Sequence, residues 1–179
     1  MSKNICYVAL PNALPSDFDN VYDFVRKQIN KYDKELEVEP YKKFFSEKET
    51  VEIAKRHGFD DLPKFKEYLE KRNNDDGMEN GLYYWLTTHN QQGKWDYFVL
   101  EGTVNCSKIL NGEIIQSEMT NHELEFDYER PVSVVTLEGI WYSKCEHNIS
   151  TDEMWENHLA NNFYNLYADN DIAILMVHD

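Results

Sequence analysis

The chain of 179 residues is long enough to bury one sizeable core, and its hydrophobic content of 41% and aromatic content of 14% argue against disorder. Its net charge of −15 excludes a general affinity for nucleic acid, which requires Lys and Arg to displace counterions from phosphates. No apolar run approaches a membrane span or a secretory signal, and three scattered cysteines argue against a disulfide framework. We therefore expect a cytoplasmic protein with free thiols that binds no membrane.

The first predicted elements are a strand and a long helix. Residues 5–10 are apolar and predict a buried strand that ends at the following proline. Ser16 predicts the N-cap of an amphipathic helix of about five turns, because apolar residues from Phe18 to Leu36 recur at spacings of three and four.

Two shorter helices are predicted next. Ser46 and Glu49 form a capping-box pattern for a helix that is expected to end at Gly58. Asp61 followed by Pro63 indicates the start of another helix, since proline fits the first turn.

The spacing of apolar residues along the chain then changes from that of helices to that of strands. Residues 73–81 predict a loop, and residues 82–88 and 94–100 predict strands that pair across a turn at 90–93. Asn111 and Gly112, between apolar pairs, predict a further hairpin.

Strands also dominate the prediction for the rest of the chain. Residues 123–129 alternate between acidic and apolar side chains, and residues 132–143 predict two strands joined by a turn at 138–139. Ser150 and Glu153 form a second capping-box pattern, for a helix whose apolar face comprises Met154, Trp155, Leu159, Phe163 and Leu166. Residues 172–177 predict a final buried strand, so we expect a single α+β domain over residues 1–179, with a mainly antiparallel sheet and about four helices.

The negative charge is concentrated in the second half of the sequence. Residues 95–179 hold sixteen acidic and three basic residues, a net charge of −13, whereas residues 1–94 hold seventeen and fifteen, a net charge of −2. An acidic half of this kind favours a basic partner surface and repels anionic ones.

The most regular part of this charge is the predicted strand 123–129. Its acidic side chains fall on one face about 6.6 Å apart, a spacing that resembles that of phosphates along a nucleic-acid strand. One interpretation is an acidic strip that binds a basic groove; the alternative is a solvated face that protects an edge strand from aggregation. The predicted partner-binding acids are Glu113, Glu118, Glu123, Glu125, Asp127 and Glu129.

Trp95 and Asp96 follow the predicted turn at residues 90–93. An exposed Trp and Asp at the end of a hairpin would form a binding hot spot, whereas a tryptophan beside a turn is also typical of a core. Trp95, Tyr97 and Val99 are expected to share one face of the strand.

The sequence carries no catalytic signature. The six histidines and three cysteines show no metal-ligand spacing, and neither a glycine-rich phosphate loop nor a nucleophile elbow is present. We therefore predict no catalytic residue, metal or cofactor. A small enzyme that uses Cys106 or Cys145 with a histidine, or a metal site assembled around residues 145–147, is the alternative, and a phage structural or assembly protein is a further one.

Residues 90–97, with the sequence NQQGKWDY, resemble a segment N-P-x-x-K-W-D-W/Y found in small acidic proteins of bacteriophages and mobile elements. Residues 138–142, with the sequence EGIWY, are similar to a D-G-x-W turn of that family. Gln91 replaces the proline of the pattern, and residues 101–104 replace its G-G-R-W motif. The resemblance implies a phage or mobile-element origin and a function like that of anti-CRISPR or antirestriction inhibitors, which mimic nucleic acid and bind basic channels of host defence complexes.

Overall fold

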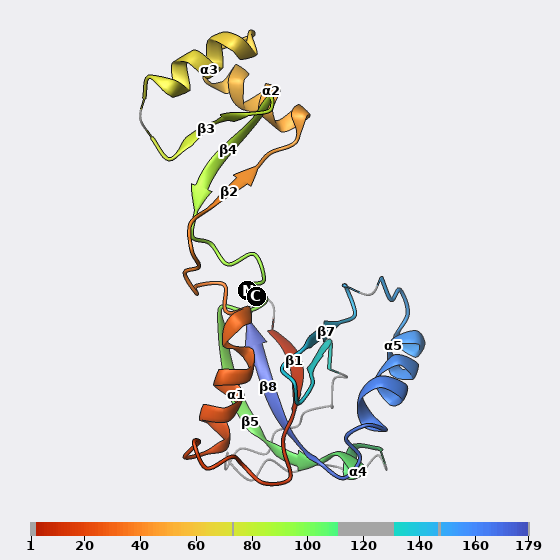
Figure 1. The fold of residues 1–179 in the computed structure, drawn as a ribbon. Coiled ribbons are helices and arrows are strands. Elements are labelled where there is room, and N and C mark those ends of the chain that lie inside the picture. The colour runs from red at the N-terminus through yellow and green to blue at the C-terminus, as the bar shows by residue number, and fades with distance from the viewer. Residues whose placement is uncertain (1–2, 73, 111–130, 147, 179) are drawn as a thin grey trace. The chain divides into compact units, whose positions relative to one another are not determined.

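The computed structural model describes residues 3–72, 74–110, 131–146 and 148–178 (Figure 1). Contacts divide the chain into unit 1, residues 1–36 and 91–179, and unit 2, residues 37–90. Each unit has its own sheet and its own core, so the expectation of one domain stays a prediction. The sheets are mainly antiparallel and the described residues form four helices of eight or more residues and one shorter helix, which confirms the α+β class.

Unit 1 contains a five-stranded sheet with the order β5-β8-β1-β6-β7. Strands β1 and β6 are parallel, and all other neighbours are antiparallel. The predicted first and last strands are confirmed and lie side by side in the middle of the sheet. The strands are β1 (Lys3–Ala9), β5 (Tyr97–Asn105), β6 (Ser133–Val135), β7 (Trp141–Ser143) and β8 (Asp171–His178).

Helices cover both faces of this sheet. Side chains of a strand alternate between the faces, so the central strands contribute apolar residues to a core on each side. On β1, Val8 packs in the core beside α1 (Val21–Ile29), and Tyr7 packs in the core beside α5 (Asp152–Leu159) and the π-helical turn η2 (Ala160–Tyr164). Figure 1 shows α1 and α5 on opposite sides of the sheet.

Helix α1 is shorter than the sequence predicts. It begins at Val21, where the Asn20 side chain accepts a hydrogen bond from the backbone N–H of Asp23 at 2.9 Å, so the predicted cap at Ser16 is wrong. A 3₁₀ turn at residues 30–32 follows, and the Lys34 N–H then donates to the Trp95 carbonyl at 2.9 Å. The backbone beyond residue 32 therefore pairs with another segment instead of continuing the helix.

The helix near the C-terminal end also differs in detail from its prediction. Thr151, not Ser150, caps α5, with its hydroxyl accepting from the Met154 N–H at 3.2 Å. The π-helical turn adds one residue to the helical period, so Tyr167 faces the core and Leu166 is 66% exposed. Met154, predicted on the apolar face, is 52% exposed.

The middle of unit 1 confirms one hairpin and corrects another prediction. Strands β6 and β7 pair around a turn in which Gly139 has a φ of +73°, as the Glu138–Gly139 signal predicts. Helix α4 (Cys106–Leu110) lies where the sequence predicts the first strand of a hairpin. The hairpin turn at residues 111–112 and the strand 123–129 lie outside the described residues.

Unit 2 is a three-stranded antiparallel sheet with two helices. Ser46 and Glu49 form the predicted capping box, and the Asp61 side chain caps the next helix, which carries proline in its first turn. The sheet has the order β2-β4-β3. The elements are β2 (Tyr41–Phe44), α2 (Glu47–Arg56), α3 (Leu62–Glu70), β3 (Asp76–Glu79) and β4 (Leu82–Thr87).

One loop prediction and one strand-pairing prediction in this region are wrong. Residues 76–79 form β3 within the predicted loop, because Asn80 and Gly81, both with positive φ, make a tight hairpin turn to β4. Strand β4 pairs with β2 and β3, and β5 pairs with β8, so the predicted pairing across residues 90–93 does not occur. The core of unit 2 is built on Ala54, Phe65, Leu69 and Tyr83.

Candidate functional site

Six of the eight predicted partner-binding residues lie outside the part of the chain that the structure describes. The acidic strip therefore stays a prediction. These residues are Glu113, Glu118, Glu123, Glu125, Asp127 and Glu129.

Trp95 is a core residue and offers no exposed ring to a partner. It is 5% exposed, its indole N–H donates to the Ile29 carbonyl at 3.2 Å, and its ring packs edge-on against Phe98 at 5.3 Å. It precedes β5 and does not share a strand face with Tyr97, which is 60% exposed. Asp96 has a 42% exposed side chain and lies 3.8 Å from the Lys34 ammonium.

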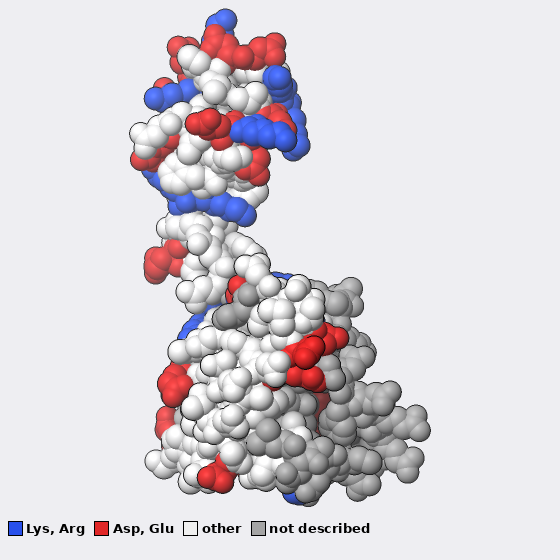
Figure 2. All heavy atoms as spheres, turned by 90° about the vertical axis from the view of Figure 1, so that its right-hand side faces the viewer, with Lys and Arg blue, Asp and Glu red and all other residues white. Residues whose placement is uncertain are grey.

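The described acidic residues of unit 1 include an exposed group on α5. Asp152, Glu153 and Glu156 lie on this helix, and the first two occupy its first turn, where the helix dipole favours negative charge. Lys144 forms an ion pair with Asp152. Figure 2 shows acidic side chains gathered on the face of unit 1 that carries α5, and both signs of charge intermixed on unit 2.

The division of charge between the units is similar to that between the halves of the sequence. Unit 1 holds 21 acidic and nine basic residues, a net charge of −12. Unit 2 holds twelve acidic and nine basic residues, a net charge of −3. Most of the net negative charge therefore lies on unit 1.

The buried cysteines are poorly suited to nucleophilic chemistry. Burial raises the pKa of Cys6 to about 12 and that of Cys106 to about 11, so both thiols stay protonated at neutral pH. Cys145 is exposed, and His147 of the predicted metal alternative lies outside the described residues. Within the described ranges, no group of three or more His, Cys, Asp or Glu side chains could hold a metal ion.

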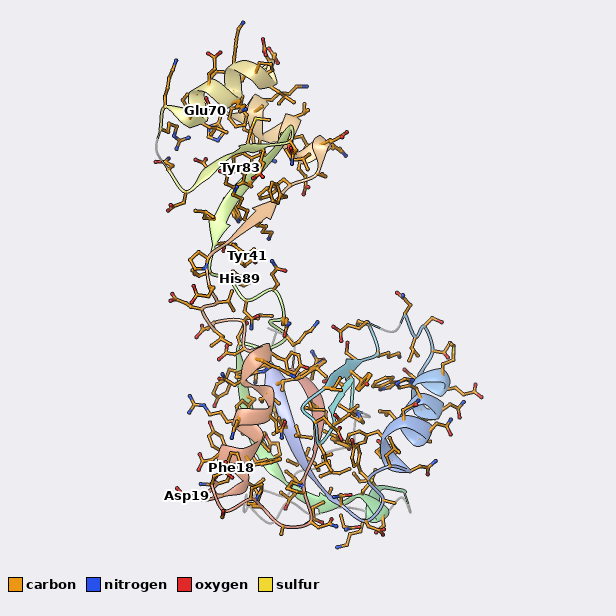
Figure 3. The ribbon with its side chains drawn as sticks, viewed as in Figure 1. Phe18, Asp19, Tyr41, Glu70, Tyr83 and His89 are labelled. Atoms are coloured by element: carbon orange, nitrogen blue, oxygen red, sulfur yellow. The ribbon has the colours of Figure 1, made fainter. Side chains whose placement is uncertain are left out.

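A cavity in unit 2 is the feature that sequence reasoning missed. Asp76 and Trp85 are paired across β3 and β4, and Tyr83 lies on the same side of the sheet, which α2 and α3 cover only in part. Tyr83 is 7% exposed, whereas Trp85 is 43% exposed. In Figure 3, Tyr83 lies on β4, beside the helix that ends at Glu70. The cavity is a surface pocket that is widely open to solvent, and it measures about 470 Å³. It is lined by Asn74, Asp75, Asp76, Tyr83, Trp85 and Leu86.

The residues that line this cavity lie in segments for which the sequence predicts a different structure. Asn74, Asp75 and Asp76 fall in the segment predicted as a loop, and Trp85 falls in a strand predicted to pair elsewhere. The Asn80–Gly81 turn, placed between Asp76 and Trp85, would have brought the two side chains together.

No protein-family model matches the chain, and neither a curated protein nor a solved structure matches it. The resemblance to small acidic phage proteins therefore stays an expectation from residues 90–97 and 138–142. None of the helices in the described ranges has the length and apolarity needed to cross a lipid bilayer.

Proposed function

We propose that the protein is a non-enzymatic inhibitor or adaptor that binds a basic protein surface through the acidic surface of unit 1. The observation that carries the proposal is the net charge of −12 on unit 1 against −3 on unit 2. Surfaces that bind nucleic acid are rich in Lys and Arg, so the partner class is a nucleic-acid-handling host complex. This function places the protein in the cytoplasm.

Electrostatic steering gives the proposal a kinetic signature. Complementary charge accelerates association by about 10-fold to 1,000-fold at low ionic strength. The Debye length is about 10 Å at 0.1 M salt and about 3 Å at 1 M salt, so the attraction weakens as salt rises. Association of the partner should therefore depend strongly on salt, and duplex DNA should compete for the same basic surface.

The test uses two variants with equal changes in charge. The unit 1 variant carries Glu123→Gln, Glu125→Gln, Asp127→Asn and Glu129→Gln. The control variant carries Gln at four exposed acids of unit 2, namely Glu37, Glu39, Glu52 and Glu67.

Each immobilised protein is incubated with a bacterial cell extract, and captured proteins are eluted by stepwise salt and by duplex DNA. We expect the parent and the control variant to retain nucleic-acid-binding proteins that elute in both ways. The unit 1 variant should lose them and should associate at least about tenfold more slowly at low salt. Equal retention by the two variants would refute the acidic-strip hypothesis.

A further inference from the structure

The lining of the cavity in unit 2 includes two carboxylates, those of Asp75 and Asp76. The Tyr83 hydroxyl donates to Asp76 Oδ2 at 3.0 Å, whereas Asp76 Oδ1 is buried and has no hydrogen-bond partner in the described structure. Burial and the bond to Asp76 raise the pKa of Tyr83 to about 12, so the phenol stays a neutral donor. Arg72 is close enough to act electrostatically on Tyr83, but no ion pair joins it to Asp76 among the described residues. A buried carboxylate oxygen without a hydrogen-bond partner is costly, so a further donor placed beside it is stabilised.

The remaining lining of the cavity also fits a cation. Asp75 is exposed at the cavity and adds a second carboxylate, and none of the six described lining residues is a Lys or Arg. Trp85 is 43% exposed as a residue, and its indole packs against Phe45 at 5.0 Å between ring centres. The face of an indole attracts positive charge. Leu86 adds apolar surface beside it.

The nearest cations of the chain are engaged at the margins of the cavity. Arg72 Nη1 donates to the Tyr68 hydroxyl at 3.3 Å, and the guanidinium lies 5.3 Å from the centre of that ring. With its amide oxygen turned toward Arg72, Asn74 accepts from Arg72 Nε at 3.1 Å. The Lys43 ammonium lies 5.9 Å from the Trp85 ring, near the outer limit of a cation–π contact.

We propose that this cavity binds the guanidinium group of an arginine side chain on a partner protein. The planar cation stacks on Trp85, donates hydrogen bonds to the Asp75 carboxylate and adds positive charge beside Asp76. Arginine fits better than lysine because its guanidinium is planar, weakly hydrated and able to pair with carboxylates through two parallel hydrogen bonds. The site lies entirely within unit 2, so it does not depend on the acidic surface of unit 1.

The test is an NMR titration of the ¹⁵N-labelled full chain with blocked single amino acids. N-acetyl-arginine amide should shift the Trp85 indole resonance, with a dissociation constant on the order of 1 mM for so small a ligand. N-acetyl-citrulline amide has nearly the same shape without the charge and should bind at least about tenfold more weakly. N-acetyl-lysine amide should also bind more weakly.

Variants separate this site from the rest of the acidic protein. Asp76→Asn and Asp75→Asn should each weaken binding of N-acetyl-arginine amide at least about threefold. Asp60→Asn, at an exposed acid of the same unit, should leave that binding unchanged. Asp75 is exposed, so its variant tests the site even if Asp76→Asn perturbs the sheet. Equal binding of citrulline or lysine, shifts spread over unit 1 without Trp85, or no shift at all would overturn the proposal.

Discussion

Replacing Phe65 by Ala should remove most of the stability of unit 2 and leave that of unit 1 unchanged. Phe65 is 0% exposed, and its ring packs against Phe59, Tyr68 and Tyr83 with centroids 5.7, 6.4 and 6.0 Å away. Truncation of a buried phenylalanine to alanine costs about 3–5 kcal/mol. The free energy of unfolding of globular domains is roughly 0.05–0.15 kcal/mol per residue. For the 54 residues of unit 2 this gives a free energy of unfolding of roughly 3–8 kcal/mol. The substitution therefore removes most of the stability of this unit.

Hydrogen exchange measured by mass spectrometry resolves the two units. In the Phe65→Ala variant, peptides from β2, β3 and β4 should lose protection, whereas those from β1 and β8 should keep it. Phe65→Leu is the milder control, because it keeps much of the volume and should cost under about 1.5 kcal/mol. Phe163→Ala is the reciprocal control, since this residue is buried in the core of unit 1. Equal loss of protection in both units would refute the reasoning and favour one cooperative domain.

Two further substitutions and one labelling experiment test local features of the structure. Hydrogen bonds from Ser46 lower the Glu49 pKa below 4.5, so the ionised carboxylate stabilises unit 2 above pH 4.5 and this stabilisation is lost as the pH falls through the folded-state pKa. Glu49→Gln should therefore make the melting temperature of unit 2 depend less on pH between about pH 3 and pH 7. Unchanged acid dependence would contradict it. Gly139→Ala should destabilise unit 1 by about 1–3 kcal/mol in denaturant unfolding, since the φ of Gly139 is +73° and the new Cβ would collide with the Gln28 side chain. An unchanged midpoint of the denaturant unfolding curve would contradict this prediction. Intact-mass analysis after brief thiol labelling should show one adduct, at exposed Cys145, because the other two thiols are buried; three rapid adducts would contradict their burial.

Local signals account for the elements that the sequence predicts correctly. The capping box at Ser46, the proline after Asp61 and the apolar run of β8 each depend on residues within one turn or one strand. The length of α1 depends on more distant residues, because Trp95 pairs with the backbone after Tyr32. A helical period in the sequence cannot reveal that competing partner.

Strand pairing and the candidate site depended still more on distant contacts. Nearness along the chain suggested that β4 pairs with β5, but β5 pairs with β8, which begins some 70 residues later. The cavity beside Trp85 exists because two helices cover one part of a sheet and leave another part open, and no alternation of residue types records that coverage. Burial of Trp95 likewise depends on α1, through its hydrogen bond to the Ile29 carbonyl.

The position of β8 between β5 and β1 has a consequence for how the protein is made. Register pairs such as Tyr7 with Ile174 join segments separated by more than 160 residues, and β8 is the strand that links β5 to the rest of the sheet. Unit 2, in contrast, is continuous in sequence and complete at residue 90. During translation unit 2 can therefore fold first. Strand β1 can pair with its antiparallel neighbour β8 only after residues 171–178 have left the ribosome.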